Sequence, residues 1–219
     1  MDSASPRIVV LISGSGSNLQ ALINACQRGL VGGKVVKVIS NRPDVYGLSR
    51  AEQAGIESQV LDHKHFESRE EFDTALADMI DQAQPDWIAL AGFMRILTPA
   101  FVSRYIGKMI NIHPSLLPKF PGLHTHQRVL DERETHHGAS VHFVIPELDA
   151  GPVITQGKIA ILAEDTADSL AARVLQIEHK IYPQALKLLI EGKIKYHDQT
   201  AYLENEPLPP NGYQTAYDL

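Results

Sequence analysis

Short apolar runs alternate with helix-patterned segments along the first half of the chain, and this alternation limits the possible folds more than any other feature. The runs that are typical of strands are Arg7–Ile12, Val35–Ser40, Glu57–Leu61, Trp87–Phe93 and the run that starts at Met109. Strands that are apolar throughout and alternate with helices form parallel sheets with both faces covered. We therefore expect an α/β fold with a mostly parallel sheet and helices on both faces.

Helical patterns fill the gaps between these strands. The expected helices run over Leu19–Cys26, through Ala51 and Glu52 to near Gly55, from a Ser68/Glu71 capping box toward Gln84, and from Pro99 through Tyr105.

The second half of the chain has a different texture, starting with a loop after Pro118. Its sequence pattern then predicts a helix through Glu132, strands over Ala139–Ile145 and Val153–Leu162, and a long helix over about 166–190 that is bent at Pro183. The polar, proline-rich tail from Asp198 is expected to extend over the surface or to be mobile. No repeat or linker divides the chain, so we expect one domain over residues 1–219.

Composition excludes several classes of protein. The 219 residues are 44% hydrophobic and 21% charged, which argues against disorder. A net charge of -6 provides no basic excess for binding nucleic acid. Cys26 is the single cysteine, so the chain forms no internal disulfide and suits a reducing cytosol. Met1–Pro6 has no basic region and the following apolar run is short, so we expect a cytoplasmic protein without a membrane segment.

The run that starts at Met109 ends in Asn111-Ile112-His113-Pro114, where two polar side chains interrupt a buried strand. Residues i and i+2 of a strand point to the same face, so the Asn111 amide and the His113 imidazole are expected side by side. Pro114 keeps His113 extended. Such a pair can stabilise an oxyanion and transfer a proton. The structural alternative is that Asn111 caps a turn and His113 is a hydrogen-bonded core histidine.

A glycine-rich turn, Ser13-Gly14-Ser15-Gly16-Ser17-Asn18, joins the first strand to the first helix. The unpaired backbone amides at such a helix start, together with the helix dipole, favour an anion. We interpret the turn as a site for one phosphate monoester. The alternative is that the turn only connects strand and helix.

Two nucleotide-binding motifs do not fit this turn. Leu19 replaces the third glycine of the dinucleotide fingerprint, and Ser40-Asn41-Arg42 provides no acidic ribose ligand after the second strand. A nicotinamide-dependent oxidoreductase is therefore a disfavoured alternative. No Gly-Lys-Ser/Thr follows the turn, which excludes a Walker-type triphosphate loop.

Asp149 lies in the loop Glu147–Pro152, whose glycine and proline can bring the backbone close to another element. An aspartate within ~4–6 Å of His113 would favour the imidazolium and raise the pKa of that histidine above about 6.5. The alternative is that Asp149 only forms the turn.

Five histidines fall in one short window: His124, His126, His136, His137 and His142. No pair has the i, i+4 spacing of a zinc hydrolase, and His136-His137 is interpreted as a surface turn, so no metal is expected. Arg69, Arg95 and Arg128 are either anion partners or solvated charges.

Five segments, in this order and spacing, resemble the phosphoribosylglycinamide formyltransferase family in its bacterial single-domain form. They are Ile12–Gln20, Leu90–Leu97, Asn111–Pro118, Pro121–His126 and Glu147–Ile154. The Ser115–Pro118 stretch alone indicates only the wider formyl-folate superfamily, but the glycine turn and Gln176–His179 point to this member. The resemblance covers nearly the whole chain and implies a Rossmann-like formyltransferase fold. It divides the domain into a phosphate-binding half at about 7–105, a catalytic and folate half at about 106–197, and the tail 198–219.

The resemblance also implies roles for individual residues. Asn111, His113 and Asp149 would be catalytic; Gly16, Ser17 and Asn18 would hold the substrate phosphate, with Glu178 at the ribose. The folate pocket would be formed by Arg69, Met94, Arg95, Ile96, Leu97, Asn111, Ile145, Pro146, Glu147, Leu148 and Asp149. Two departures from relatives are Ser15, where Asn is frequent, and Ile145-Pro146, which replaces more polar residues.

The function implied is transfer of the formyl group from 10-formyltetrahydrofolate, the co-substrate, to the amine of 5-phosphoribosylglycinamide in de novo purine biosynthesis. The amine would attack directly through a tetrahedral intermediate, with no metal. The alternative is another formyltetrahydrofolate-dependent formyltransferase or a deformylase, each of which would carry an extra domain for which we see no room. The expected partners are small-molecule substrates, with no nucleic acid or membrane, in a monomer or weak homodimer.

Overall fold

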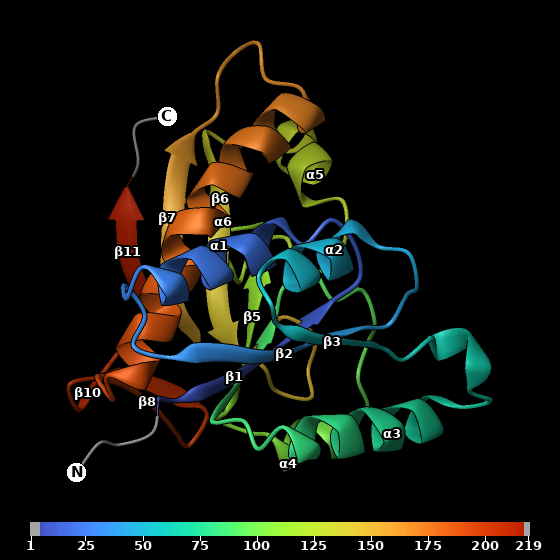
Figure 1. Ribbon diagram of the computed structural model, residues 1–219. Helices are drawn as coiled ribbons and strands as arrows, with labels where there is room; N and C mark the ends of the chain where they lie inside the picture. The colour runs from blue at the N-terminus through green and yellow to red at the C-terminus, as the bar shows by residue number, and fades with distance from the viewer. Residues whose placement is uncertain (1–4, 217–219) are drawn as a thin grey trace.

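The computed structural model describes residues 5–216 and is built on an eight-stranded sheet (Figure 1). Residues 1–4 and 217–219, which belong to the expected polar N-terminal segment and tail, lie outside the described residues. The strand order is β11-β7-β6-β5-β4-β1-β2-β3. The strands are β1 Arg7–Ile12, β2 Lys34–Ser40, β3 Glu57–Val60, β4 Trp87–Leu90, β5 Met109–His113, β6 His136–Phe143, β7 Val153–Ala160 and β11 Tyr213–Ala216.

The sheet is mostly parallel, as the alternation predicts. Strands β5, β4, β1, β2 and β3 are parallel neighbours, and β6 is antiparallel to both β5 and β7. The edge strand β11 returns parallel to β7. A second sheet has the order β10-β9-β8, with β8 Ile194–His197, β9 Thr200–Leu203 and β10 Glu206–Pro207.

Helices cover both faces of the main sheet (Figure 1). The alternation of side chains along β1 shows which helices cover each face. Ile8, Val10 and Ile12 pack in one apolar cluster with the helices α1 Ser17–Gln27, α2 Tyr46–Gln53, α5 Thr125–Asp131 and α6 Ala167–Ile190. Val9 and Leu11 point the other way, into a cluster with α3 Arg69–Gln82 and α4 Pro99–Arg104. Each face of the sheet therefore has its own core.

Several boundaries differ from the expected ones. Strand β4 ends at Leu90 rather than Phe93, because Gly92 takes a positive φ of 74° and turns the chain away from the sheet. Strand β6 begins at His136, so the prediction of a surface turn at His136-His137 is wrong. The long helix is confirmed as α6, which continues through Pro183, and the bend expected there stays a prediction. The described part of the tail has regular structure, since β9, β10 and β11 all lie beyond Asp198.

The loops after three parallel strands meet at one edge of the sheet. They are the glycine turn after β1, residues 91–98 after β4, and the segment that begins at Pro114 after β5. Open α/β sheets bind ligands at this carboxyl edge, so the fold itself marks where to look for a site. Within residues 5–216, no helix is long and apolar enough to cross a membrane.

Candidate active site

Asn111 and His113 end β5, and the antiparallel strand β6 places a polar residue opposite each of them. Asn111 pairs with His142 and His113 with Ser140 in the register of the two strands. The Asn111 Nδ2 lies 3.2 Å from the His142 Nε2, and the His142 Nδ1 lies 2.9 Å from the Phe143 carbonyl oxygen. Because an amide nitrogen can only donate, this network assigns the His142 proton to Nδ1, with Nε2 accepting from Asn111.

Asp149 reaches both histidines from the loop between β6 and β7. Its Oδ2 lies 3.5 Å from the His113 Nδ1 and accepts a 2.8 Å hydrogen bond from the Gly122 amide, while its Oδ1 lies 3.8 Å from the His142 Nε2. The side chains of His113 and Asp149 are 7% and 8% exposed. The Asp149 carboxylate therefore lies close to two buried imidazole rings.

The backbone of this loop is tightly fitted around Asp149. Asp149 itself has φ 51°, and a Cβ at Gly151 would lie 1.8 Å from the Phe143 carbonyl oxygen. Only glycine permits that approach, and the loop thereby turns the carboxylate back over β5 and β6.

Both ring nitrogens of His113 face protein oxygens. The Nε2 lies 2.9 Å from the carbonyl oxygen of Phe120, a residue with φ 56°, and the Nδ1 faces Asp149. The Phe120 carbonyl and the Asp149 carboxylate can both accept, so either ring nitrogen of His113 has an acceptor when it carries a proton. The His113 ring is therefore held between a carboxylate and a carbonyl oxygen.

His142 is the main member of the cluster that sequence reasoning missed. Burial lowers the pKa of His142 to about 4, although the hydrogen bond with Phe143 and the nearby Asp149 carboxylate act in the opposite direction. His142 is therefore neutral at physiological pH and acts as an acceptor for Asn111. One available signal was that Ser140 and His142 repeat the i, i+2 polar pattern of Asn111 and His113.

The glycine turn forms a second cluster at the same edge of the sheet. Helix α1 starts at Ser17, and Gly16 precedes it with φ 69°. The Asn18 Nδ2 donates a 2.6 Å hydrogen bond to the Glu178 Oε2 on α6, which joins the two helices. Burial raises the pKa of Glu178 to about 7, partly opposed by the hydrogen bond from Asn18. The structure thus brings Gly16, Ser17, Asn18 and Glu178 together.

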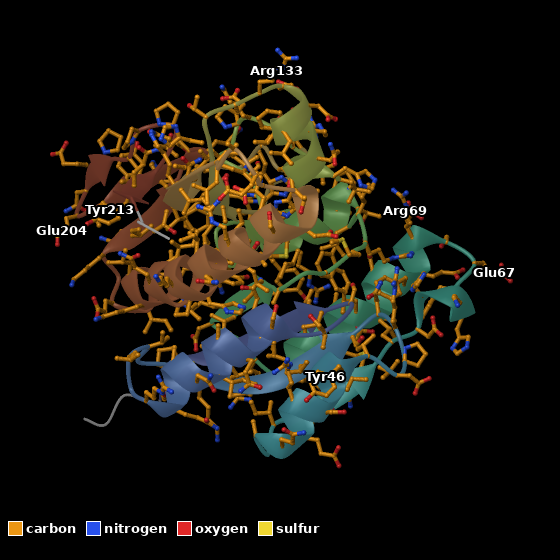
Figure 2. All side chains as sticks on the ribbon, turned by 90° about the horizontal axis from the view of Figure 1, so that it is seen from above. Tyr46, Glu67, Arg69, Arg133, Glu204 and Tyr213 are labelled. Atoms are coloured by element: carbon orange, nitrogen blue, oxygen red, sulfur yellow. The ribbon has the colours of Figure 1, made fainter. Side chains whose placement is uncertain are left out.

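A cation that sequence reasoning missed lies next to the turn. The Arg50 Nε donates a 2.8 Å hydrogen bond to the Ser15 carbonyl oxygen, and the Arg50 guanidinium lies 4.7 Å from the centre of the Tyr46 ring. Figure 2 shows Tyr46 at the surface of the molecule. Arg50 adds positive charge beside the expected anion site, and its place on α2 could not be read from a motif.

Residues 94–97 follow β4 and are half open to solvent. Met94 and Ile96 are 61% and 54% exposed, whereas Leu97 is buried. The Arg95 guanidinium lies 4.3 Å from the centre of the Phe72 ring. Arg69 is the first residue of α3 and projects from the start of that helix (Figure 2).

Residues 145–148 complete the expected folate set, and Leu148 is exposed. The exposed apolar side chains of Met94, Ile96 and Leu148 are better suited to contact an aromatic ligand than to face water.

Two other histidines of the window contact each other. His137, at the start of β6, is buried, and its Nε2 lies 3.0 Å from the Nδ1 of His126 on α5. Burial lowers the pKa of His137 to about 3 and also lowers the pKa of His126. Over residues 5–216, no three His, Cys, Asp or Glu side chains are grouped to hold a metal ion. Arg128 is hydrogen-bonded to the Pro121 carbonyl oxygen at 2.6 Å.

Comparison with known proteins gives consistent matches over almost the full chain. Residues 6–186 match the model of the formyl transferase family. The phosphoribosylglycinamide formyltransferase of Escherichia coli strain K12 is 53% identical, over 94% of this chain and 97% of that protein. The enzyme of the same name from Haemophilus influenzae is 45% identical, over 94% and 98%.

Solved structures agree with these sequence matches. The phosphoribosylglycinamide formyltransferase of Coxiella burnetii superposes with a TM-score of 0.92 at 50% identity, over 96% of this chain and 99% of that one. Glycinamide ribonucleotide transformylase 1 of Symbiobacterium toebii has a TM-score of 0.88 at 41% identity, over 91% and 94%.

Proposed function

The chain belongs to the formyl transferase family, and we propose that Asn111, His113 and Asp149 carry out its reaction. It is a folate-dependent formyltransferase: it transfers the formyl group of 10-formyltetrahydrofolate to the amine of 5-phosphoribosylglycinamide in purine biosynthesis. The relatives that match over nearly their whole length are of this type, which argues against another formyltransferase or a deformylase with an additional domain.

In the proposed mechanism, the substrate amine attacks the formyl carbon and a tetrahedral oxyanion forms. One N–H of the Asn111 amide is held by His142, and the other is available for the oxyanion. The His113 imidazolium supplies a second donor by exchanging its Nε2 contact with the Phe120 carbonyl for a contact with the substrate. Such preorganised donors in a water-poor site are the main source of rate enhancement in acyl transfer.

The second half of the reaction moves a proton and breaks a bond. The new C–N bond to the amine forms, the amine nitrogen loses one proton, and N10 of the folate gains one as its bond to the formyl carbon breaks. Asp149 keeps His113 charged and lies next to it, so the pair can relay this proton directly or through water. The scheme requires no metal.

The two substrates occupy neighbouring parts of the carboxyl edge of the sheet. We place the phosphate on the amides of Gly16, Ser17 and Asn18, with the Glu178 carboxylate at the ribose hydroxyls. The folate lies against Arg69, Met94 to Leu97, Asn111 and residues 145–149. The approach of Asp149, from the loop between β6 and β7, to the β5 strand that carries Asn111 and His113 is the observation that carries the proposal.

The proposal extends to partners and location. The substrates are small molecules, and a net charge of -6 disfavours nucleic-acid binding. We place the enzyme in the cytoplasm, away from membranes, as a monomer or weak homodimer.

The test is direct. Purified protein is incubated with glycinamide ribonucleotide and 10-formyltetrahydrofolate while folate absorbance is followed and the formylated product is identified by mass. We expect deformylated folate and formylated amine in equal amounts, and only with both substrates present. Loss of formate from folate without the amine would indicate a deformylase and contradict the proposal.

A further inference from the structure

Ser13, the first residue after β1, connects the glycine turn to the residues proposed to bind folate. We propose that Ser13 is a positioning residue for the folate site: its hydroxyl fixes the backbone of Met94, and thereby residues 94–97, relative to the phosphate loop. The inference rests on the proposed function, because it assigns the hydroxyl an effect on one of the two substrates.

Two hydrogen bonds at Ser13 form a chain with only one consistent direction. The Met94 amide donates to the Ser13 Oγ at 2.7 Å, and the Ser13 hydroxyl donates to the Asn41 Oδ1 at 2.6 Å. Ser13 and Asn41 are 4% and 1% exposed, so water does not readily replace either partner. Hydrogen bonds in such a buried chain strengthen one another.

Asn41 anchors these two hydrogen bonds because its own backbone is held in place. It directly follows β2, and its carbonyl oxygen lies 2.8 Å from the Nδ1 of His63. The Met94 amide is therefore tied, through one hydroxyl, to the ends of the neighbouring strands β1 and β2.

Residues 91–98 are held by a few hydrogen bonds and by the buried side chains of Phe93 and Leu97. They form no helix or strand. At one end the Ala91 amide donates to the Leu11 carbonyl oxygen, and at the other the Thr98 amide donates to the Asp73 Oδ2 at 2.7 Å. Between these anchors the side chain of Met94 is exposed, so its backbone is positioned by the bond from its amide to the Ser13 hydroxyl together with the packing of the neighbouring Phe93.

Ser13→Ala removes the hydroxyl and leaves the Met94 amide without its acceptor. A net hydrogen bond of ordinary strength corresponds to a change of about tenfold in affinity. We expect KM for 10-formyltetrahydrofolate to rise about tenfold, while KM for glycinamide ribonucleotide changes by less than about twofold because the Gly16 to Asn18 amides do not bond to Ser13.

Ser40→Ala is the matched control. Ser40 is also a fully buried serine at the end of a neighbouring strand, but its hydroxyl bonds only to the backbone of Arg42. A merely structural role for Ser13 predicts that both variants lose thermal stability and leave KM for folate unchanged. Positioning predicts that only Ser13→Ala raises KM for folate.

Asn41→Ala tests the second of the two linked hydrogen bonds rather than Ser13 alone. It removes the acceptor of the hydroxyl but leaves the Oγ for Met94, so its effect on KM for folate should be smaller. The double variant Ser13→Ala/Asn41→Ala should bind folate no worse than Ser13→Ala, because the two residues act through one chain.

Amide hydrogen exchange at Met94 separates this inference from the proposed function. Exchange should accelerate in Ser13→Ala and not in Ser40→Ala, whether or not the protein transfers a formyl group. Failure of wild-type transfer would contradict the proposed function alone. Unchanged Met94 exchange, or an equal rise of both KM values in Ser13→Ala, would overturn the positioning role.

Discussion

Asn111 on β5 and His142 on β6 face each other, with 3.2 Å between the amide Nδ2 and the imidazole Nε2. This contact selects one orientation of the amide, since only its nitrogen can donate to the unprotonated Nε2. It leaves the second N–H of the amide for a ligand. If Asn111 is an oxyanion donor as proposed, His142 determines how well that donor is oriented.

The first prediction follows from this contact. His142→Phe keeps an aromatic ring in the buried position but removes the acceptor, so the Asn111 amide is no longer oriented. We expect kcat to fall about tenfold or more, as is typical when an outer partner of a reacting group is lost. His142→Gln, whose side-chain oxygen can accept the same hydrogen bond, should retain more activity. Steady-state kinetics compares the two, and equal losses would contradict an orienting role.

The second prediction concerns the donors themselves. Asn111→Ala and His113→Ala should fold but be nearly inactive, because removing one oxyanion donor lowers turnover by roughly 10²–10³. The measurements are kcat for each variant and circular dichroism as the check of folding. Wild-type turnover in His113→Ala would refute the assignment of this residue.

The third prediction uses two glycines of the same turn. Gly16 has φ 69°, and a Cβ there would lie 2.7 Å from the Gly47 Cα, whereas a Cβ at Gly14 meets nothing within 4 Å. Gly16→Ala should therefore cost about 1–3 kcal/mol of unfolding free energy from backbone strain and raise KM for glycinamide ribonucleotide. Gly14→Ala is the control and should change either quantity little. Equal effects of the two substitutions would contradict a strained phosphate loop at Gly16.

Local patterns were enough to predict much of the fold. The apolar run Arg7–Ile12 is β1 with the same bounds, and the Asn111/His113 pair lies on one strand as the i, i+2 spacing requires. The Ser68 cap also forms, with its Oγ accepting from the Glu71 amide at 3.1 Å. These features depend on neighbours in sequence, so the sequence alone determines them.

Contacts between distant residues were beyond that reasoning. His142 meets Asn111 only because β6 runs antiparallel to β5 in one register, and periodicity does not specify which strands pair. The tail strand β11 also depends on a contact between distant residues. The Gln214 Nε2 donates to the Gln156 Oε1 at 3.0 Å, and a polar, proline-rich sequence does not reveal this pairing. The grouping of Asn18 with Glu178, 160 positions apart, came from family resemblance rather than from spacing.

The last prediction is a pH dependence at Glu178. Its pKa rises from 4.5 in a solvated state to about 7 in the folded protein, chiefly through burial. The folded state therefore binds more protons than the unfolded state between these values, and the stability it contributes is present below pH 4.5 and lost as pH rises through about 7. Above pH 7 the buried charge costs about 3 kcal/mol.

Glu178→Gln removes this cost and keeps an oxygen that can accept from Asn18. Urea unfolding should show the variant to be more stable than wild type at pH 8 and nearly equal at pH 4.5. Glu52→Gln, at an exposed position of α2, is the control and should show no such gain. If the Glu178 carboxylate binds the substrate ribose as an anion, the stabilised variant should also have a higher KM for glycinamide ribonucleotide at pH 8. A variant destabilised at pH 8 would show instead that the charge is compensated in the folded protein.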